Sequence, residues 1–142
     1  MEPNHRVLVV EDDPTLRRLL AVLLERRALE VSTAADGDEA IAAMAETTFG
    51  AIVLDLLMPK SSGFDVLRIM RAADPALLKR VVVVTGAAEA LIRDLVREAL
   101  VWRVVRKPID VGDIGDEVVA CLRQEPRETN HLEPPYAERR TS

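Results

Sequence analysis

Four consecutive valines, Val81–Val84, are the feature that most restricts what this chain can become. β-Branched side chains favour extended backbone, and an unbroken apolar run of this length is typical of a strand that is buried on both faces. Strands of this kind belong to parallel sheets, whose connections must cross over through a helix. The run therefore predicts an α/β fold if similar strands, separated by helices, occur elsewhere in the chain.

Four further segments have strand character and are spaced along the chain. They are Val7–Val10, the weaker Leu29–Thr33, Ala51–Leu54, and Val101–Val105, which Trp102 and Arg103 interrupt. Five strands that each precede a helix imply a parallel sheet with helices on both faces.

Amphipathic patterns fill the intervals between these strands. The first helix begins at Pro14 with Asp13 as its cap, and its leucines recur at the helical period. We assign its arginines to the solvent side: Arg17, Arg18, Arg26 and Arg27. The later helices are indicated by Asp36 to Met44, by about Phe64 to Ala72 with Asp74 and Pro75 as the stop, by Leu91–Ala99, and by Val111–Leu122 with Asp110 as a cap. Cys121 falls on the apolar face of the last helix, so we assign it to the core.

Composition narrows the class of protein. A chain of 142 residues with 49% hydrophobic content fits one domain, whereas residues 125–142 are polar and predict a disordered tail. The net charge of -5 argues against nucleic-acid binding, because phosphate recognition normally requires a basic patch. One cysteine cannot form an internal disulfide, and no apolar stretch approaches the roughly 20 residues of a membrane span. We therefore expect a soluble, cytoplasmic protein with no membrane partner.

Polar residues end four of the predicted strands. Glu11 and Asp12 follow the first strand, Asp55 the third, Thr85 the fourth and Lys107 the fifth. Because the carboxyl ends of parallel strands share one edge, these side chains are expected to meet there. Clustered carboxylates repel one another unless a cation joins them, and oxygen ligands of this type suit Mg2+. With a lysine and a hydroxyl opposite, the set favours phosphoryl transfer onto a carboxylate, although Asp55 alone also fits a loop carboxylate that caps a turn.

Four motifs in this order resemble the receiver domain of a two-component response regulator. They are Val10-Glu11-Asp12-Asp13, Asp55-Leu56-Leu57-Met58-Pro59 with Gly63, Thr85-Gly86-Ala87, and Lys107-Pro108. The resemblance covers about residues 5–124 and implies a doubly wound, flavodoxin-like (βα)5 fold with strand order 2-1-3-4-5. Because no DNA-binding or catalytic domain follows in the sequence, we expect a stand-alone regulator; a receiver excised from a longer protein would look similar, although Met1 and the trailing tail fit a complete product.

The resemblance assigns a role to each site residue. Asp55 would accept the phosphoryl group from the phosphohistidine of a histidine kinase or phosphotransfer protein and become an aspartyl phosphate. Mg2+ would be held by Asp12, Asp55 and the backbone carbonyl of Leu57, with Glu11 acting through water. Lys107 would pair with the acceptor and then with a phosphoryl oxygen. Thr85 would hydrogen-bond the phosphoryl group, and the small Gly86 would leave room for it.

The chain departs from the family pattern at several positions. Val104 stands three residues before the lysine, where the family commonly has Tyr or Phe, so the usual coupling between the threonine and an aromatic ring is in doubt. Leu57 and Ala87, two residues after the acceptor and after the threonine, are apolar and cannot orient an attacking water, so we expect slow loss of phosphate. Trp102 fits a contact surface and, equally, a side chain packed on its own domain.

The expected output is a changed docking surface rather than turnover. A downstream protein would bind through the face of Leu91–Ala99, Val101–Val105 and Val111–Leu122, and a homodimer is compatible with the sequence. A pseudo-receiver that binds partners without phosphorylation is one alternative. A phosphatase-type enzyme that forms an aspartyl phosphate is another, but it would need an acid at position 57. A flavin carrier is disfavoured, because Glu11-Asp12-Asp13 would repel a phosphate in the absence of metal.

Overall fold

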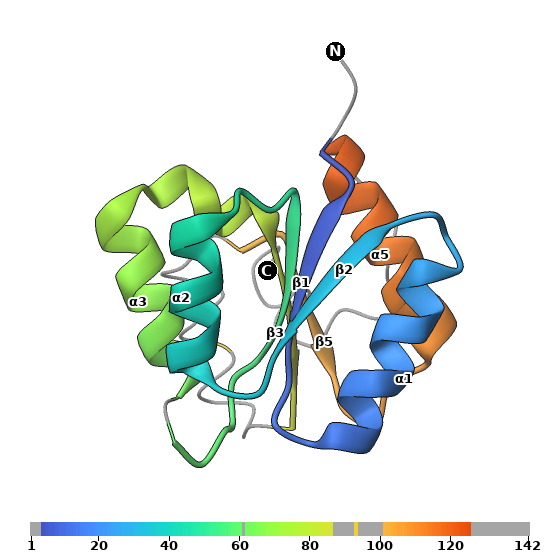
Figure 1. Ribbon diagram of the computed structural model, residues 1–142, viewed down its shortest axis with the longest axis horizontal. Helices are drawn as coiled ribbons and strands as arrows, with labels where there is room; N and C mark the ends of the chain where they lie inside the picture. The colour runs from blue at the N-terminus through green and yellow to red at the C-terminus, as the bar shows by residue number, and fades with distance from the viewer. Residues whose placement is uncertain (1–3, 61, 87–92, 94–100, 126–142) are drawn as a thin grey trace, which may run out of the picture.

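The computed structural model describes residues 4–60, 62–86, 93 and 101–125, and it forms a sheet between two layers of helices (Figure 1). The strands are β1 (Arg6–Val10), β2 (Glu30–Ala34), β3 (Ala51–Asp55), β4 (Val81–Thr85) and β5 (Arg103–Arg106). All neighbouring strands pair in parallel, in the order β2-β1-β3-β4-β5. The α/β class and the strand order implied by the resemblance are therefore confirmed.

The helices cover both faces of the sheet. They are α1 (Pro14–Glu25), α2 (Gly37–Glu46), α3 (Gly63–Ala73), the 3₁₀ helix η1 (Pro75–Arg80) and α5 (Val111–Arg123). Helices α1 and α5 lie on one face, and α2 and α3 lie on the other (Figure 1). The helix predicted over residues 91–99 falls outside the described part of the chain, except for Arg93. Among the described residues, no helix combines the length and the apolar character that crossing a membrane requires.

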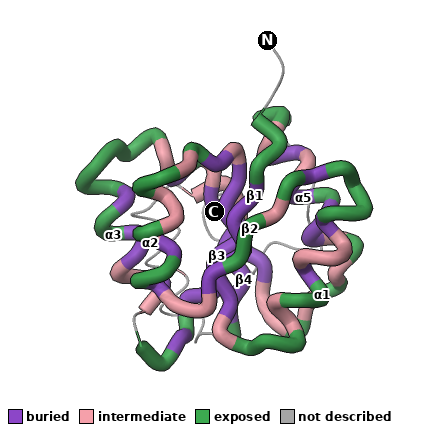
Figure 2. The backbone as a smooth tube through the Cα atoms, viewed as in Figure 1, coloured by how far each residue is buried: buried purple, intermediate pink, exposed green. Residues whose placement is uncertain are grey.

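The side chains of β1, β3 and β4 alternate between two hydrophobic clusters, which is why these three strands are buried almost throughout (Figure 2). Leu8, Ile52 and Val83 belong to the cluster under α2 and α3. Val7, Val53 and Val82 belong to the cluster under α1 and α5, which also contains Cys121. Burial of the Cys121 thiol, followed by the nearby Glu117 carboxylate, raises its pKa to about 12, and the assignment of Cys121 to the core is confirmed.

Side-chain caps set the helix starts, as the sequence predicts. Asp13 accepts hydrogen bonds from the amides of Thr15 and Leu16, and Pro14 occupies the first turn of α1. Asp110 caps α5 in the same way, through the amides of Gly112 and Asp113. These caps fix the direction in which the chain leaves the carboxyl edge of the sheet.

Two local predictions differ from the structure, and one further element was not predicted. Strand β5 is Arg103–Arg106 rather than residues 101–105, because the pairing of Val82 with Arg103 sets its start. The stop at Asp74 and Pro75 is confirmed, since α3 ends at Ala73, but the 3₁₀ helix η1 follows it because the Asp74 side chain caps a new turn through the amide of Ala76. The assignment of the α1 arginines to solvent is wrong for Arg17, which is half-buried and bonded to the preceding loop.

Candidate functional site

The carboxyl edge of the sheet gathers the predicted site residues. Glu11 directly follows β1, Asp55 ends β3, Thr85 ends β4, and Lys107 directly follows β5. Asp55 pairs with Val84, and Thr85 pairs with Arg106, so the central strands end at nearly the same level. The Lys107 amide also donates to the Thr85 carbonyl at 2.8 Å, which holds the last two loops together.

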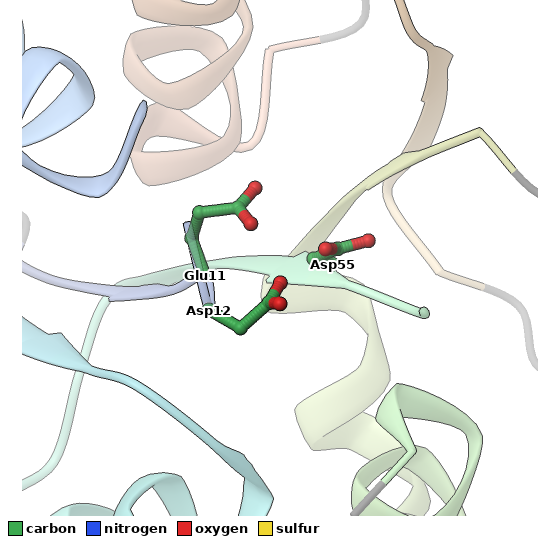
Figure 3. Close-up of side chains that lie close together, drawn as sticks. All are labelled: Glu11, Asp12 and Asp55. Atoms are coloured by element: carbon green, nitrogen blue, oxygen red, sulfur yellow. The ribbon is translucent and has the colours of Figure 1, made fainter. Parts of the chain in front are cut away.

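Three carboxylates converge at this edge (Figure 3). Glu11, Asp12 and Asp55 each offer an oxygen, and these oxygens lie within 4.8 Å of one another. Glu11 and Asp55 are each only 2% exposed, whereas Asp12 lies toward the rim and is more accessible. Two of the three negative charges are therefore held away from water and close to a third.

Lys107 supplies the positive charge that faces this cluster. Its Nζ lies 3.1 Å from Glu11 Oε1 and 3.4 Å from Asp55 Oδ2. The side chain is 29% exposed, so the ammonium bridges the buried carboxylates and the solvent. The peptide bond between Lys107 and Pro108 is cis. The predicted partnership of Lys107 with Asp55 is thus present, and Lys107 also pairs with Glu11.

The pKa values of Glu11 and Lys107 are shifted because charged side chains lie close together in a partly buried site. Burial raises the pKa of Glu11 to about 7, and the neighbouring Asp55 carboxylate adds to the rise, while the Asp13 amide and Lys107 oppose it. Burial by itself would lower the pKa of Lys107, but the carboxylates of Asp55 and Glu11 outweigh it, so the pKa is raised. Lys107 therefore stays charged, whereas Glu11 binds a proton close to neutral pH when no cation is present.

The backbone around Asp55 is tightly constrained. Asp55 Oδ1 accepts a hydrogen bond of 3.1 Å from the amide of Leu57, which fixes the carboxylate relative to its own loop. Gly63 returns the loop against β3, because its amide donates to the Leu56 carbonyl at 3.0 Å. A Cβ atom at position 63 would overlap the Asp55 carbonyl and lie 2.7 Å from the Leu56 Cα. The sequence motif includes Gly63, but nothing in its spacing indicates this close approach.

Thr85 and Gly86 occupy the end of β4. The Thr85 side chain is fully buried, and a Cβ atom at Gly86 would meet no atom within 4 Å. Space is therefore open beside the threonine, which agrees with the expected role of the small residue. Ala87, the third member of this motif, lies outside the described residues.

Val104 in β5 and Trp102 just before this strand are two positions at which the chain departs from the family pattern. Val104 is buried in the cluster under α2 and α3, where it pairs with Val83, so it is a core residue. Trp102 is half-buried against the other cluster, and its indole Nε1 is buried. This packing agrees with the view that Trp102 rests on its own domain. The contact-surface alternative stays a prediction.

The donor set of the site is chemically specific. Clustered carboxylate oxygens are ligands for a hard divalent cation, and Mg2+ commonly uses one or two carboxylates together with water and phosphate oxygens. The excess of negative charge over the single ammonium of Lys107 fits the binding of such a cation.

A family model describes the same segment. The model for the response regulator receiver domain matches residues 7–119. The probable transcriptional regulatory protein TcrX of Mycobacterium tuberculosis is 34% identical over 118 residues, covering 83% of this chain and 50% of that protein. The transcriptional regulatory protein ResD of Bacillus subtilis is 35% identical over 121 residues, covering 84% of this chain and 48% of that protein. The chain thus spans about half the length of these relatives.

Solved structures share the fold. A structure described as an adenylate cyclase from Rhodopirellula baltica is 30% identical, with a TM-score of 0.76 over 86% of this chain and 90% of that chain. A response regulator receiver protein from Pseudomonas putida is 29% identical, with a TM-score of 0.74 over 84% of this chain and 97% of that chain.

Proposed function

Because this chain belongs to the response regulator receiver domain family, we propose that it is a phosphorylation-dependent switch whose acceptor is Asp55. The observation that carries the proposal is the environment of that carboxylate. It is buried at the end of the central strand β3, lies 3.4 Å from the Lys107 ammonium, and shares a cation-sized cluster with Glu11 and Asp12. We assign residues 5–124 to the receiver domain and residues 125–142 to a tail.

The proposed metal is Mg2+. Asp12, Asp55 and the backbone carbonyl of Leu57 would bind it directly, and Glu11 would contribute through water. The assignment of Asp12 as a direct ligand is supported by its place toward the rim, where an ion can enter with part of its water shell. When bound, Mg2+ offsets the charge of the acidic cluster and of the incoming phosphoryl oxygens.

The proposed reaction moves one phosphoryl group. An oxygen of Asp55 forms a bond to phosphorus as the bond between phosphorus and the donor's histidine nitrogen breaks, and the electron pair stays on the imidazole. Lys107 is within reach of Asp55 Oδ2 and would pair with a phosphoryl oxygen afterwards. Thr85, at the end of the adjacent strand, would donate its hydroxyl to the same group. The donor is a histidine kinase or a histidine phosphotransfer protein.

The proposed output is a changed docking surface for a downstream protein. The expected face comprises residues 91–99, which are outside the described part except for Arg93, together with Val101–Val105 and Val111–Leu122. A direct role in nucleic-acid binding is not proposed, because the chain carries a net charge of -5. A homodimer through this face is compatible with the proposal. Family membership makes the cytoplasm the expected compartment.

The chemistry we propose ends at self-phosphorylation and slow loss of the phosphate. Leu57 is 51% exposed beside the acceptor, yet its side chain has no acid or amide that could activate water. This observation speaks against a phosphatase-type enzyme and for a long-lived aspartyl phosphate. Substitution Leu57→Asn should shorten the lifetime of the phosphate, followed by intact-mass spectrometry after removal of the donor. An unchanged lifetime would contradict the proposed effect of Leu57.

Incubation with acetyl phosphate and Mg2+ tests the central proposal. Wild-type protein should gain the mass of one phosphoryl group, and Asp55→Asn should gain none. The exposed, matched variant Asp38→Asn should behave as the wild type. Phosphate on Asp55→Asn would refute the assignment of the acceptor. An absence of phosphate on the wild type would favour the alternative, a pseudo-receiver that acts through contacts alone.

A further inference from the structure

The side chain of one arginine binds two consecutive carbonyl groups of the acidic loop between β1 and α1. The Arg17 guanidinium donates from Nη1 to the Glu11 carbonyl at 2.9 Å and to the Asp12 carbonyl at 3.4 Å. The backbone amide of Arg17 donates to the next carbonyl, that of Asp13, at 2.9 Å. The side chain is half-buried, whereas that of its neighbour Arg18 is exposed.

These bonds fix the loop whose side chains form the cluster. The Glu11 amide donates to the Ala34 carbonyl at 3.1 Å, which ties the end of β1 to the end of β2. The Asp13 amide donates to Glu11 Oε2 at 3.2 Å, and the Asp13 side chain caps α1. With its carbonyls bound to Arg17, the loop presents the carboxylates of Glu11 and Asp12 toward Asp55 (Figure 3).

In the described part of the chain, the Arg17 guanidinium binds backbone carbonyls rather than carboxylates, and this choice of partners determines its effect on the site. Among the described residues, its hydrogen bonds go to carbonyl oxygens and leave the carboxylates of Glu11 and Asp12 available to a cation. Hydrogen bonds from a charged donor are stronger than those between neutral groups, so the restraint on the loop is substantial. Arg17 thereby orders the acidic residues without neutralising them.

We propose that Arg17 is a positioning residue that preorganises Glu11 and Asp12 for a divalent cation. This inference rests on the proposed function, which places Mg2+ in the cluster. Residues that orient metal ligands from outside the coordination sphere commonly change metal affinity about 10- to 100-fold when they are removed. Ordered loop carbonyls are the means by which Arg17 exerts such an effect.

The positive charge of Arg17 and its restraint on the loop predict opposite changes in Mg2+ affinity when the side chain is removed. The Arg17 guanidinium is a positive charge near the site, so its removal should tighten Mg2+ binding if simple repulsion dominates. If the restraint on the loop dominates, its removal should weaken Mg2+ binding, because binding must then order the loop. The sign of the change in affinity therefore separates the two effects.

The experiment compares Arg17→Met and Arg17→Lys with the matched control Arg18→Met, which removes an exposed arginine one position along the same helix. Amide hydrogen exchange of residues 11–17 is measured in metal-free protein, and Mg2+ affinity is measured by titration calorimetry. Arg17→Met should exchange faster in this loop and bind Mg2+ about tenfold more weakly. Arg17→Lys keeps the charge but lacks the planar fork, so its affinity should be intermediate. Arg18→Met should match the wild type.

Unchanged or tighter Mg2+ binding by Arg17→Met would overturn the inference. If this variant fails to fold, Arg17→Lys decides, and wild-type affinity in that variant would overturn the inference as well. A wild type that binds no Mg2+ also overturns it. The proposed function can fail on its own. In that case Arg17→Met shows the expected loss of Mg2+ affinity, but the wild type takes up no phosphate. If the wild type takes up phosphate and Arg17→Met keeps its affinity, only the positioning role is refuted.

Discussion

The two ends of the sheet are built on different principles. At the carboxyl end, Glu11 and Asp55 are buried together and share the ammonium of Lys107. At the amino end, polar groups meet opposite charges or neutral carbonyls: Arg6 pairs with Glu30 at 3.0 Å, Asn4 Nδ2 donates to the Thr48 carbonyl at 2.8 Å, and Arg80 Nη1 donates to the Phe49 carbonyl at 3.1 Å. One end concentrates like charges, and the other end satisfies its polar groups.

Because of this difference, the two ends of the sheet contribute differently to the stability of the fold and to the chemistry of the site. Buried carboxylates that face one another destabilise a fold unless a cation or a proton joins them, whereas hydrogen bonds to neutral carbonyls carry no such repulsion. Natural proteins tolerate such a loss of stability at sites where function requires the destabilising residues. Substitutions at the amino end should therefore change stability alone, and substitutions at the carboxyl end should change stability in a way that depends on Mg2+ and pH.

The largest effects are expected from two glycines, one at each end. A Cβ atom at Gly50 would overlap the Asn4 carbonyl, and one at Gly63 would overlap the Asp55 carbonyl. Gly50→Ala and Gly63→Ala should each lower the free energy of unfolding by about 3 kcal/mol in urea denaturation, because backbone atoms must move. Only Gly63→Ala should also weaken Mg2+ binding in titration calorimetry. Equal Mg2+ affinity in the two variants would break the proposed division between the ends.

Lys107→Met should lower the free energy of unfolding of the metal-free protein by about 2 kcal/mol, because it leaves the carboxylates of Glu11 and Asp55 buried without the ammonium that pairs with them. The loss is smaller than that for a fully buried pair, since Lys107 is 29% exposed. Saturating Mg2+ should recover part of the stability of the variant, measured as the midpoint of urea denaturation. Lys79→Met, which removes an exposed lysine from η1, should change little in either condition. A similar loss of stability in Lys107→Met and Lys79→Met would contradict the proposed difference between the two ends of the sheet.

The pH dependence of stability should come from the carboxyl end. The pKa of Glu11 is raised from 4.5 to about 7, so the folded protein holds this proton more tightly than the unfolded chain does. Stability in the absence of metal should therefore fall as pH rises from about 4.5 through about 7. Glu11→Gln, which cannot titrate, should flatten this part of the profile. A profile with the same slope in the variant would show that other groups cause it.

The smallest effect is expected for Gly86→Ala. A Cβ atom at this position meets nothing within 4 Å, so the free energy of unfolding should change by less than about 0.5 kcal/mol. Phosphorylation by acetyl phosphate should also continue, since a methyl group leaves much of the open space beside Thr85. A strong loss of phosphate uptake with unchanged stability would show that the incoming group needs all of that space.

Residue patterns that act locally were predictable from the sequence. Asp13 and Pro14 mark the start of α1, and the valines of β4 mark a buried strand, because caps and β-branched runs depend on neighbours in the chain. The convergence of Glu11, Asp55 and Lys107 was also predictable, because parallel strands must end at one edge. The roles of these residues in phosphoryl transfer stay predictions.

Contacts that depend on the folded backbone were not predictable. Arg17 belongs to the polar residues of an amphipathic helix, and nothing in its spacing tells that its guanidinium reaches back to the carbonyls of Glu11 and Asp12. Glu117 is fully buried on α5 and lies 3.5 Å from the Arg103 guanidinium, although carboxylates are rarely found inside. Arg17 is held by the backbone of the preceding loop and Glu117 by a side chain from β5, and neither partner is part of the helical pattern itself.

Trp102 gives the chain an optical property of its own. It is the single tryptophan in the sequence, and it lies immediately before β5 with its indole packed against the cluster under α1 and α5. Its amide donates to the Val81 carbonyl at 2.9 Å, which anchors the Trp102 backbone to β4 at the start of the strand that leads to Lys107. Indole fluorescence responds to the polarity and packing around the ring. The protein therefore carries an intrinsic, label-free reporter at the start of the strand that leads to Lys107, the partner of Asp55.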